Sequence, residues 1–280
     1  MNNTKVWYIT GASQGLGLTL VKKLLGAGHR VAATSRNAET LKKAVVLIDQ
    51  ARFLPLAVDL NNTDSVDDSI REVLAAFGRI DVLVNNAGYG MAGTLEETDD
   101  QKIRAIIDVN LVAAINVTRR VLPVMRAQRS GYLINIGSVA GFSGAPGWSV
   151  YSATKAALAA FSEVLALDVA EFGIRVTVVE PAGFRTGFLT EHSLAFTASA
   201  IDGYDAVRET QKRYLAMNGQ QSGDPEKAAG IFIRLADMPE PPLHLFLGAD
   251  AYARASKKLA AMQAELEQWK DTTMAADYVV

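Results

Sequence analysis

Near its N-terminus the chain reads Val6-Trp7-Tyr8-Ile9-Thr10-Gly11-Ala12-Ser13-Gln14-Gly15-Leu16-Gly17. An apolar run leads into a loop with three glycines, and a helical pattern follows the loop. Glycine is needed where a chain turns sharply and where the backbone must approach a pyrophosphate without a Cβ in the way. The N-terminus of the next helix attracts an anion through its free N–H groups. A tight turn without a ligand is the alternative, but the position after the first strand favours a nucleotide site.

Short apolar runs alternate with longer helical patterns along the rest of the chain. Most of the runs are continuous, which is typical of parallel strands buried on both faces. We predict strands at Val6–Thr10, Arg30–Thr34, Phe53–Val58, Asp81–Val84, Tyr132–Ile136, Arg175–Val179 and Leu243–Leu247. This alternation indicates an α/β fold: a Rossmann-like, doubly wound, mostly parallel seven-stranded sheet with helices on both faces.

No linker or repeat divides the chain, so residues 1–280 are predicted to form a single domain. The regular pattern is lost between about 184 and 223, and long segments of this kind are usually lids or binding loops. A helical extension is predicted at about 249–280. Four apolar residues follow helical spacing there, which favours core or subunit-interface packing over a cofactor site: Leu259, Met262, Leu266 and Trp269.

Composition excludes several classes of function. A formal net charge of −2 gives no electrostatic reason to expect a nucleic acid or an anionic membrane as a partner. The chain has no cysteine, which excludes disulfides, thiolate catalysis and cysteine-ligated metals. His29, His192 and His244 lack metal-ligand spacing, so no metal site is expected. With no signal peptide and no apolar run near the ~18 residues of a membrane helix, we expect a cytosolic protein.

The end of the second strand bears on the choice of dinucleotide. An NAD-type site places an acidic residue there, against the ribose 2′-hydroxyl. Ser35 holds that place in this chain and Arg36 follows it. A guanidinium at this point is suited to a bidentate contact with a 2′-phosphate. A solvent-facing arginine is the alternative interpretation, but the missing acid favours NADP(H) over NAD(H).

Tyr151 and Lys155 are four residues apart, which places them on one face of a helix. A free phenol has a pKa of about 10, too high for efficient proton exchange at neutral pH. A lysine charge ~4 Å away contributes on the order of 4 kcal/mol at an effective dielectric of ~20. That is enough to lower the pKa of the phenol toward neutrality, less the cost of desolvation. The pair is therefore a candidate general acid–base unit, although the spacing alone is common on exposed helices.

The companions of this pair make the pattern specific. Ser138 would emerge at the carboxyl end of the fifth predicted strand, where ligands bind in open α/β sheets. Asn85-Asn86-Ala87-Gly88 ends the fourth strand, and Asn110 lies in the helix between them. Together with Thr10–Gly17 and Tyr151–Lys155, this ordered set resembles the short-chain dehydrogenase/reductase family in its compact single-domain form. The resemblance covers residues 5 to about 190 and weakens beyond Thr190.

The resemblance implies a role for each catalytic candidate. Tyr151 would protonate the carbonyl oxygen as hydride arrives, or deprotonate the alcohol in the reverse direction. Lys155 would lower the pKa of Tyr151 and hold the nicotinamide-ribose hydroxyls. Ser138 would hydrogen-bond the substrate oxygen. Asn110 would hold a helix distortion and a water that leads to Lys155.

The same resemblance implies a cofactor-binding set. Asp59 would contact the adenine amino group, and Asn86 to Gly88 would shape the adenosine-ribose side. The complete set is Gly11, Ser13, Gln14, Gly15, Leu16, Gly17, Ser35, Arg36, Asp59, Leu60, Asn86, Ala87, Gly88, Tyr151, Lys155, Pro181, Gly183 and Thr186. Two positions depart from the family pattern: Gln14 stands where many NADPH-using members have a basic residue, and Ala182 follows Pro181 where glycine is usual.

Several apolar side chains are candidates for the rim of a substrate pocket, with core packing as the alternative for each: Tyr89, Met91, Phe142, Trp148, Phe184, Phe188 and Phe196. They suggest an apolar ketone, aldehyde or alcohol. No cluster of cations for an acidic substrate is evident, with Arg185 as a possible exception. The family resemblance suggests a homodimer or homotetramer.

The sequence therefore predicts an NADP(H)-dependent oxidoreductase that interconverts a ketone or aldehyde and an alcohol, with Tyr151 as general acid–base. The alternative is a non-catalytic NADP(H)-binding sensor or scaffold on the same fold, because fold does not fix function. A sugar-nucleotide epimerase or dehydratase is a third class. Those relatives usually have a different glycine spacing and a larger C-terminal substrate domain.

Overall fold

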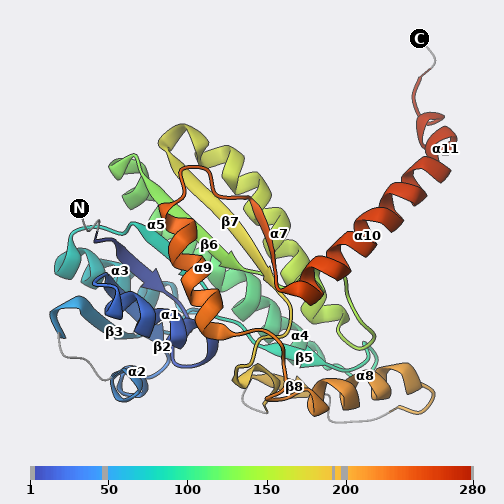
Figure 1. Cartoon of the computed structure of the whole chain (residues 1–280), viewed down its shortest axis with the longest axis horizontal. Helices are drawn as coiled ribbons and strands as arrows, with labels where there is room; N and C mark the ends of the chain where they lie inside the picture. Colours follow the sequence, from blue (N-terminus) through green and yellow to red (C-terminus); the bar gives the residue numbers. More distant parts are fainter. Residues whose placement is uncertain (1–3, 46–49, 191–192, 197–200, 279–280) are drawn as a thin grey trace.

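The computed structural model describes residues 4–45, 50–190, 193–196 and 201–278. Its centre is a seven-stranded sheet in the order β3-β2-β1-β4-β6-β7-β9, in which every neighbouring pair is parallel (Figure 1). The strands are β1 (Val6–Ile9), β2 (Arg30–Ser35), β3 (Phe53–Ala57), β4 (Val82–Asn85), β6 (Gly131–Ile136), β7 (Ile174–Pro181) and β9 (His244–Leu247). The predicted fold class is confirmed, and each predicted strand matches one strand of this sheet within a few residues.

Helices cover both faces of the sheet. On one face α1 (Gly15–Gly26) packs beside α9 (Pro225–Asp237), with α2 (Ala38–Ala44) near β2 and the edge strand β3. On the other face lie α3 (Thr63–Phe77), α5 (Ala113–Gln128) and α7 (Ser149–Val169). Side chains of strand β1 alternate between the two faces of the sheet. Trp7 and Ile9 belong to the hydrophobic core on the α1 face, whereas Val6 and Tyr8 belong to the core on the α3 face.

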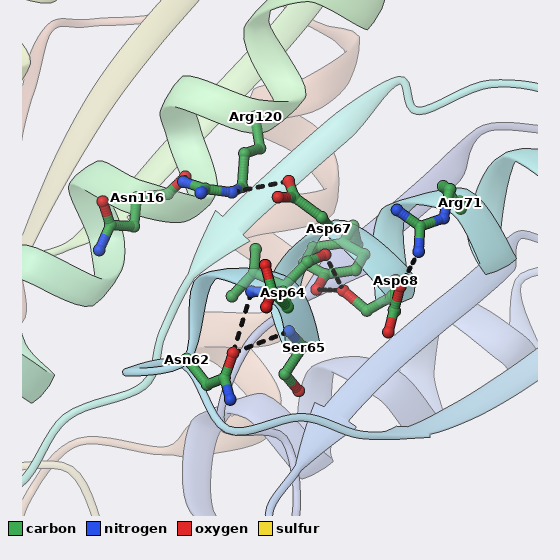
Figure 2. A network of polar contacts seen from close by, with 11 residues as sticks. Asn62, Asp64, Ser65, Asp67, Asp68, Arg71, Asn116 and Arg120 are labelled. Carbon is green, nitrogen blue, oxygen red and sulfur yellow. Dashed lines mark hydrogen bonds and ion pairs between the residues drawn. The ribbon is translucent and has the colours of Figure 1, made fainter.

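Polar contacts fix the start of α3 and its position against α5 (Figure 2). The side chain of Asn62 accepts hydrogen bonds from the backbone N–H groups of Asp64 and Ser65, at 2.9 and 3.2 Å. Such an N-cap contributes about 1 kcal/mol. Arg120 of α5 forms an ion pair with Asp67 of α3, with 2.7 Å between Nε and Oδ1. These contacts fix α3 against α5 in the helix layer on this face of the sheet.

Part of the chain between residues 184 and 223 is regular, although the sequence shows no clear pattern there. It contains the short 3₁₀ helix η4 (Gly187–Leu189), strand β8 (Leu194–Phe196) and helix α8 (Asp205–Ala216). Strand β8 pairs in parallel with β5 (Gly90–Ala92) in a second, two-stranded sheet. Three-residue strands are too short to show a period, and α8 buries only Val207 and Thr210. Neither element could therefore be predicted from periodicity.

The C-terminal residues form α10 (Ala249–Gln268) and α11 (Lys270–Met274), which project away from the body (Figure 1). Only Ala251 and Ala255, near the start of α10, are buried. The four apolar residues of the predicted stripe (Leu259, Met262, Leu266 and Trp269) are 49–61% exposed. Core packing is therefore the wrong interpretation of this stripe within a single chain. Among the described residues no helix is long and apolar enough to cross a membrane.

Candidate active site

A cavity of about 690 Å³ lies beside the glycine-rich loop, at the carboxyl ends of the sheet strands. Segments far apart in the sequence line it: the loop after β1, the end of β6, helix α7, the loop after β7, helix α8 and the start of α10. Twelve of the predicted catalytic and cofactor-binding residues are among the lining residues: Gly11, Gln14, Gly15, Leu16, Asn86, Gly88, Ser138, Tyr151, Lys155, Pro181, Gly183 and Thr186.

The glycine-rich loop presents an open helix N-terminus to this cavity. Gly11 and Gly15 have φ angles of +62° and +59°, which other residues adopt only with strain. A Cβ at Gly11 would lie 2.6 Å from the Cα of Ala87, so the loop and the end of β4 touch through backbone alone. Helix α1 has no side-chain cap and no acidic residue in its first turn. Its N–H groups are therefore free to bind an anion.

The residues after β4 hold this loop in place. The side-chain amide of Asn86 donates to the carbonyl oxygens of Thr10 and Gly11, both at 2.9 Å. The hydroxyl of Thr10 accepts from the backbone N–H groups of Asn86 and Ala87, at 3.0 and 3.1 Å. Asn86 thus shapes the site by fixing the backbone of the loop.

Ser138 and Tyr151 meet through their side chains. Ser138 is the N-cap of the short helix α6 (Val139–Phe142), where its hydroxyl accepts from the N–H of Ala140 at 3.1 Å. Tyr151 lines the same cavity. Burial raises the pKa of Tyr151 to about 12, while the interaction with the Ser138 side chain lowers it and the nearby Tyr214 raises it.

Lys155 lies one helical turn after Tyr151. Its ammonium donates to the carbonyl oxygen of Ile136 at 2.9 Å and lies 5.9 Å from the centre of the Tyr151 ring. Burial lowers the pKa of Lys155 to about 8. The expectation that Lys155 brings the pKa of Tyr151 toward neutrality is therefore not met in the protein alone. Both groups are buried, and desolvation disfavours the charged form of each.

Asn110 lies behind the cavity rather than in its wall. It is buried in a π-helical segment, η2 (Asp108–Val112), between α4 (Asp100–Ile107) and α5. The expected helix distortion is thus present, as is common near functional sites. Its amide spans the backbone of Tyr89, accepting from the N–H at 3.0 Å and donating to the carbonyl at 2.9 Å. A second contact reaches the hydroxyl of Thr154, at 3.3 Å.

Of the residues predicted for the adenosine side, Asn86 and Gly88 line the cavity, whereas the others lie outside its wall. Ser35, at the end of β2, is buried and bonds to the backbone of Asn37, whereas Arg36 is exposed and forms no ion pair with any residue that the structure describes. Glu39 belongs to α2 and pairs with Lys42. The remaining members of the predicted set outside the wall are Ser13, Gly17, Asp59, Leu60 and Ala87.

The loop after β7 closes against the glycine-rich loop. Ala182, the departure from the family pattern, lines the cavity, and its N–H donates to the carbonyl of Leu247 at 3.1 Å. The side chain of Thr186 would lie 3.6 Å from a Cβ at Gly15. The side-chain amide of Gln14 donates to the hydroxyl of Ser193 at 2.7 Å. Gln14 therefore connects the glycine-rich loop to the chain beyond β7.

Three of the seven predicted rim residues line the cavity: Trp148, Phe184 and Phe188. The other four do not. Tyr89, Met91 and Phe196 pack in a small core around β5 and β8, and the ring of Phe142 lies on that of Phe246 at 5.2 Å. The core alternative is therefore correct for Tyr89, Met91 and Phe196, whereas Phe142 is half-buried and lies outside these cores.

Sequence reasoning missed several lining residues. Six of them come from α8 and the chain after it, and from the start of α10: Arg213, Tyr214, Met217, Gln221, Asp250 and Arg254. No motif marks them. Arg185, the one cation that the sequence suggested for an acidic substrate, does not line the cavity and donates to the carbonyl of Gln221 instead.

No metal site accompanies this cavity in the described part of the chain, where no three His, Cys, Asp or Glu side chains lie close enough to hold an ion. His29 accepts from the N–H of Lys5, and His244 contacts Glu180 and Glu163. His192 lies outside the described residues.

Comparison with known proteins decides the family. The family model for short chain dehydrogenases matches residues 5–195. The chain belongs to the short-chain dehydrogenase/reductase family.

Two similar proteins align with nearly the whole length of this short-chain dehydrogenase. Oxidoreductase BOA17 of Botryotinia fuckeliana is 36% identical over 274 residues, which cover 98% of this chain and 99% of that protein. The crystal structure of a short-chain dehydrogenase from Streptomyces avermitilis is 37% identical, with a TM-score of 0.90, and covers 98% of this chain and 100% of its own. The C-terminal helices are therefore included in both matches.

Two more distant structures contain a nicotinamide cofactor. A metagenomic short-chain oxidoreductase, 28% identical with a TM-score of 0.69 and covering 88% of this chain and 98% of its own, was solved with NADP. A short-chain dehydrogenase/reductase from Burkholderia phymatum, 22% identical with a TM-score of 0.78 and covering 94% and 95%, was solved with NAD. The two together do not choose between the cofactors.

Proposed function

We propose that this short-chain dehydrogenase/reductase interconverts an apolar ketone or aldehyde and an alcohol, with Tyr151 as the general acid–base. The observation that carries the proposal is that Ser138, Tyr151 and Lys155 line one cavity with the glycine-rich loop. Trp148, Phe184, Phe188 and Leu189 give the cavity an apolar wall. Few polar groups converge on one point of an otherwise apolar pocket, as is usual for a small-molecule site.

The state of the phenol favours carbonyl reduction. With a pKa of about 12, Tyr151 keeps its proton at neutral pH and can donate it to the carbonyl oxygen. The hydroxyl of Ser138 is placed to hydrogen-bond the same oxygen and stabilise the charge that develops on it. In alcohol oxidation the phenol must first lose its proton, so this direction is favoured by alkaline pH.

The residues beside the cavity fit a nicotinamide dinucleotide. The open N-terminus of α1 suits a pyrophosphate. A Cβ on Gly11 would collide with the backbone of Ala87 and displace the glycine-rich loop that leads to this helix. Lys155 lies at the wall between this loop and Tyr151, where it would hold ribose hydroxyls. When bound, the cofactor supplies or accepts the hydride.

The experiment that tests the proposed function is a panel of carbonyl compounds of graded apolar bulk, assayed with NADPH and with NADH. Consumption of reduced cofactor is the readout, and alcohols with oxidised cofactor form the second arm. Turnover of apolar ketones supports the proposal. Cofactor binding without turnover in either direction would favour the sensor or scaffold alternative.

NADP(H) as the preferred cofactor rests on Arg36. This exposed guanidinium follows β2 without an ion-pair partner in the described chain, and the buried Ser35 leaves no acid to bind the 2′-hydroxyl. We expect Arg36→Gln to lower the preference for NADPH over NADH, as a ratio of kcat/KM values, by about tenfold or more, because a charge-assisted bidentate contact to the phosphate is lost.

A matched control is Arg30→Gln, at the exposed start of the same strand. It removes the same charge at the opposite end of β2 and should leave the preference unchanged. An equal loss of the NADPH preference in both variants would assign that preference to net charge. An unchanged ratio in Arg36→Gln would show that Arg36 does not contact the cofactor.

Lys155 predicts a pH dependence of cofactor binding. Burial lowers the pKa of its ammonium to about 8, so the charge is present below that pH and lost above it. We expect the Kd for NADPH, measured by fluorescence titration, to rise several-fold between about pH 7 and pH 9.5, because the anionic cofactor loses a nearby cation. Lys155→Arg, whose charge persists across this range, should flatten the profile. The same rise in Lys155→Arg would assign it to another group.

Three structural roles remain proposals. Residues 184–223 would serve as a cover for the cavity, since Phe184, Phe188, Tyr214 and Gln221 line it. The exposed apolar stripe of α10 supports a homodimer or homotetramer. A measurement of the particle mass in solution would test this oligomeric state. A cytosolic location stays a prediction from the sequence.

A further inference from the structure

Two arginines from different elements border the proposed substrate cavity. Arg213 comes from α8 and Arg254 from the first turns of α10. Arg213 is exposed and has no ion-pair partner among the residues that the structure describes. Arg254 donates to the carbonyl of Ser143 and lies 3.7 Å from Asp250, which also lines the cavity. A guanidinium has five N–H donors, so Arg254 keeps donors for a further acceptor.

The position of α8, and therefore of Arg213, is fixed by contacts with the body. Arg208, just over one turn before Arg213, forms an ion pair with the buried carboxylate of Glu97. Val207 packs so closely that a Cβ on Gly147 would lie 2.8 Å from it. Both contacts lie on α8 itself. Arg213 is thus held at the cavity by a tethered helix.

A continuous row of rings leads from the proposed acid to this cation. The ring of Tyr151 lies 5.4 Å from that of Trp148, and the ring of Trp148 lies 4.9 Å from that of Tyr214. The guanidinium of Arg213 lies 5.7 Å from the centre of the Tyr214 ring. An apolar chain that follows this wall from the reacting carbonyl would bring its far end to the arginine.

We propose that the substrate carries an anionic group at the end distant from its carbonyl, and that Arg213 and Arg254 bind this group. The proposal rests on the proposed function and narrows its substrate class to oxo compounds with an apolar middle and a carboxylate or phosphate end. Both kinds of anion suit a guanidinium, which binds their oxygens with paired N–H groups. Two positive charges, on Arg213 and Arg254, and one negative charge, on Asp250, lie at this part of the cavity, so the net charge favours an anion.

The test compares anionic substrates with neutral analogues. One arm uses keto acids of increasing chain length against their methyl esters. The second uses an oxoacyl-coenzyme A against the neutral N-acetylcysteamine thioester of the same acyl group. We expect the anionic member of one arm to have the higher kcat/KM, by about fivefold or more, with the ratio falling at high salt. The arm that responds identifies a carboxylate or a phosphate as the natural anion.

The variants assign the preference to the two arginines. Arg213→Gln and Arg254→Gln should each lower the anionic-to-neutral ratio of kcat/KM values by about threefold, and the double variant should remove the preference. Lys212→Gln and Lys257→Gln are matched controls, because these exposed lysines lie on the same helices but do not line the cavity.

The outcomes separate this inference from the proposed function. Turnover of neutral ketones without any charge preference would overturn the anion site and leave the function standing. If no compound is turned over, the function fails, and calorimetric binding of a keto acid against its ester then decides the anion site alone. Equal affinity of the two, or an unchanged difference in the double variant, would overturn it.

Discussion

Tyr151→Phe is expected to lower kcat for ketone reduction by about a thousandfold, because a positioned general acid typically contributes 10²- to 10⁴-fold. The hydroxyl that is removed interacts with the side chain of Ser138 inside the cavity, whereas the ring keeps its contacts with Trp148 and Phe188. Binding of NADPH should therefore change little. The free energy of unfolding should fall by only about 1 kcal/mol, the usual net contribution of one hydrogen bond.

Two other phenols serve as controls for this variant. Tyr132 is also buried, with a pKa raised to about 12 by burial, and its hydroxyl donates to Thr177 at 2.7 Å, away from the cavity. Tyr132→Phe should lose similar stability and keep its activity. Tyr214 lines the cavity next to Tyr151, and Tyr214→Phe should keep most of the activity. Loss of activity in Tyr214→Phe, with Tyr151→Phe active, would identify Tyr214 as the acid.

Gly11→Ala has the second large expected effect, on both stability and cofactor binding. The φ of +62° costs a non-glycine residue about 1 kcal/mol or more, and the new Cβ would lie 2.6 Å from the Cα of Ala87. Since backbone must move to relieve that contact, we expect the free energy of unfolding to fall by roughly 3 kcal/mol. The displaced loop should weaken binding of NADPH by about a hundredfold or more.

Gly78→Ala separates the two causes. Gly78 also has a positive φ, of +77°, but no atom would lie within 4 Å of its Cβ, and it is far from the cavity wall. It should lose about 1 kcal/mol of stability and bind NADPH normally. Chemical denaturation and cofactor titration measure both quantities. Equal stabilities of the two variants would show that the contact with Ala87 relaxes at little cost.

Much of the candidate site could be predicted because its parts are local. The glycines of the first loop, the place of Ser138 after a strand and the four-residue spacing of Tyr151 and Lys155 each depend on a few neighbouring residues. Parallel strands then place their carboxyl ends at one edge of the sheet. Twelve predicted residues meet at one cavity for that reason.

The protonation of Tyr151 could not be predicted in the same way. Spacing alone suggested a phenol with a lowered pKa, whereas burial raises the pKa to about 12. The desolvation comes from groups that reach the phenol only in the folded chain, such as Phe188 after β7 and Tyr214 on α8. The balance between a nearby charge and lost hydration is a property of the whole pocket.

The sequence by itself determined the seven strands of the main sheet, the glycine-rich loop and the spacing of Tyr151 and Lys155. Hydrophobic periodicity and the conformational freedom of glycine act within a few residues, so they can be read from the chain directly. Only the tertiary structure decided that α8 is a helix beside the cavity and that Arg213 and Arg254 border it. The position of the two arginines at the cavity depends on contacts such as the Arg208–Glu97 pair, which joins segments with no local pattern in common. Such contacts exist only once the chain has packed.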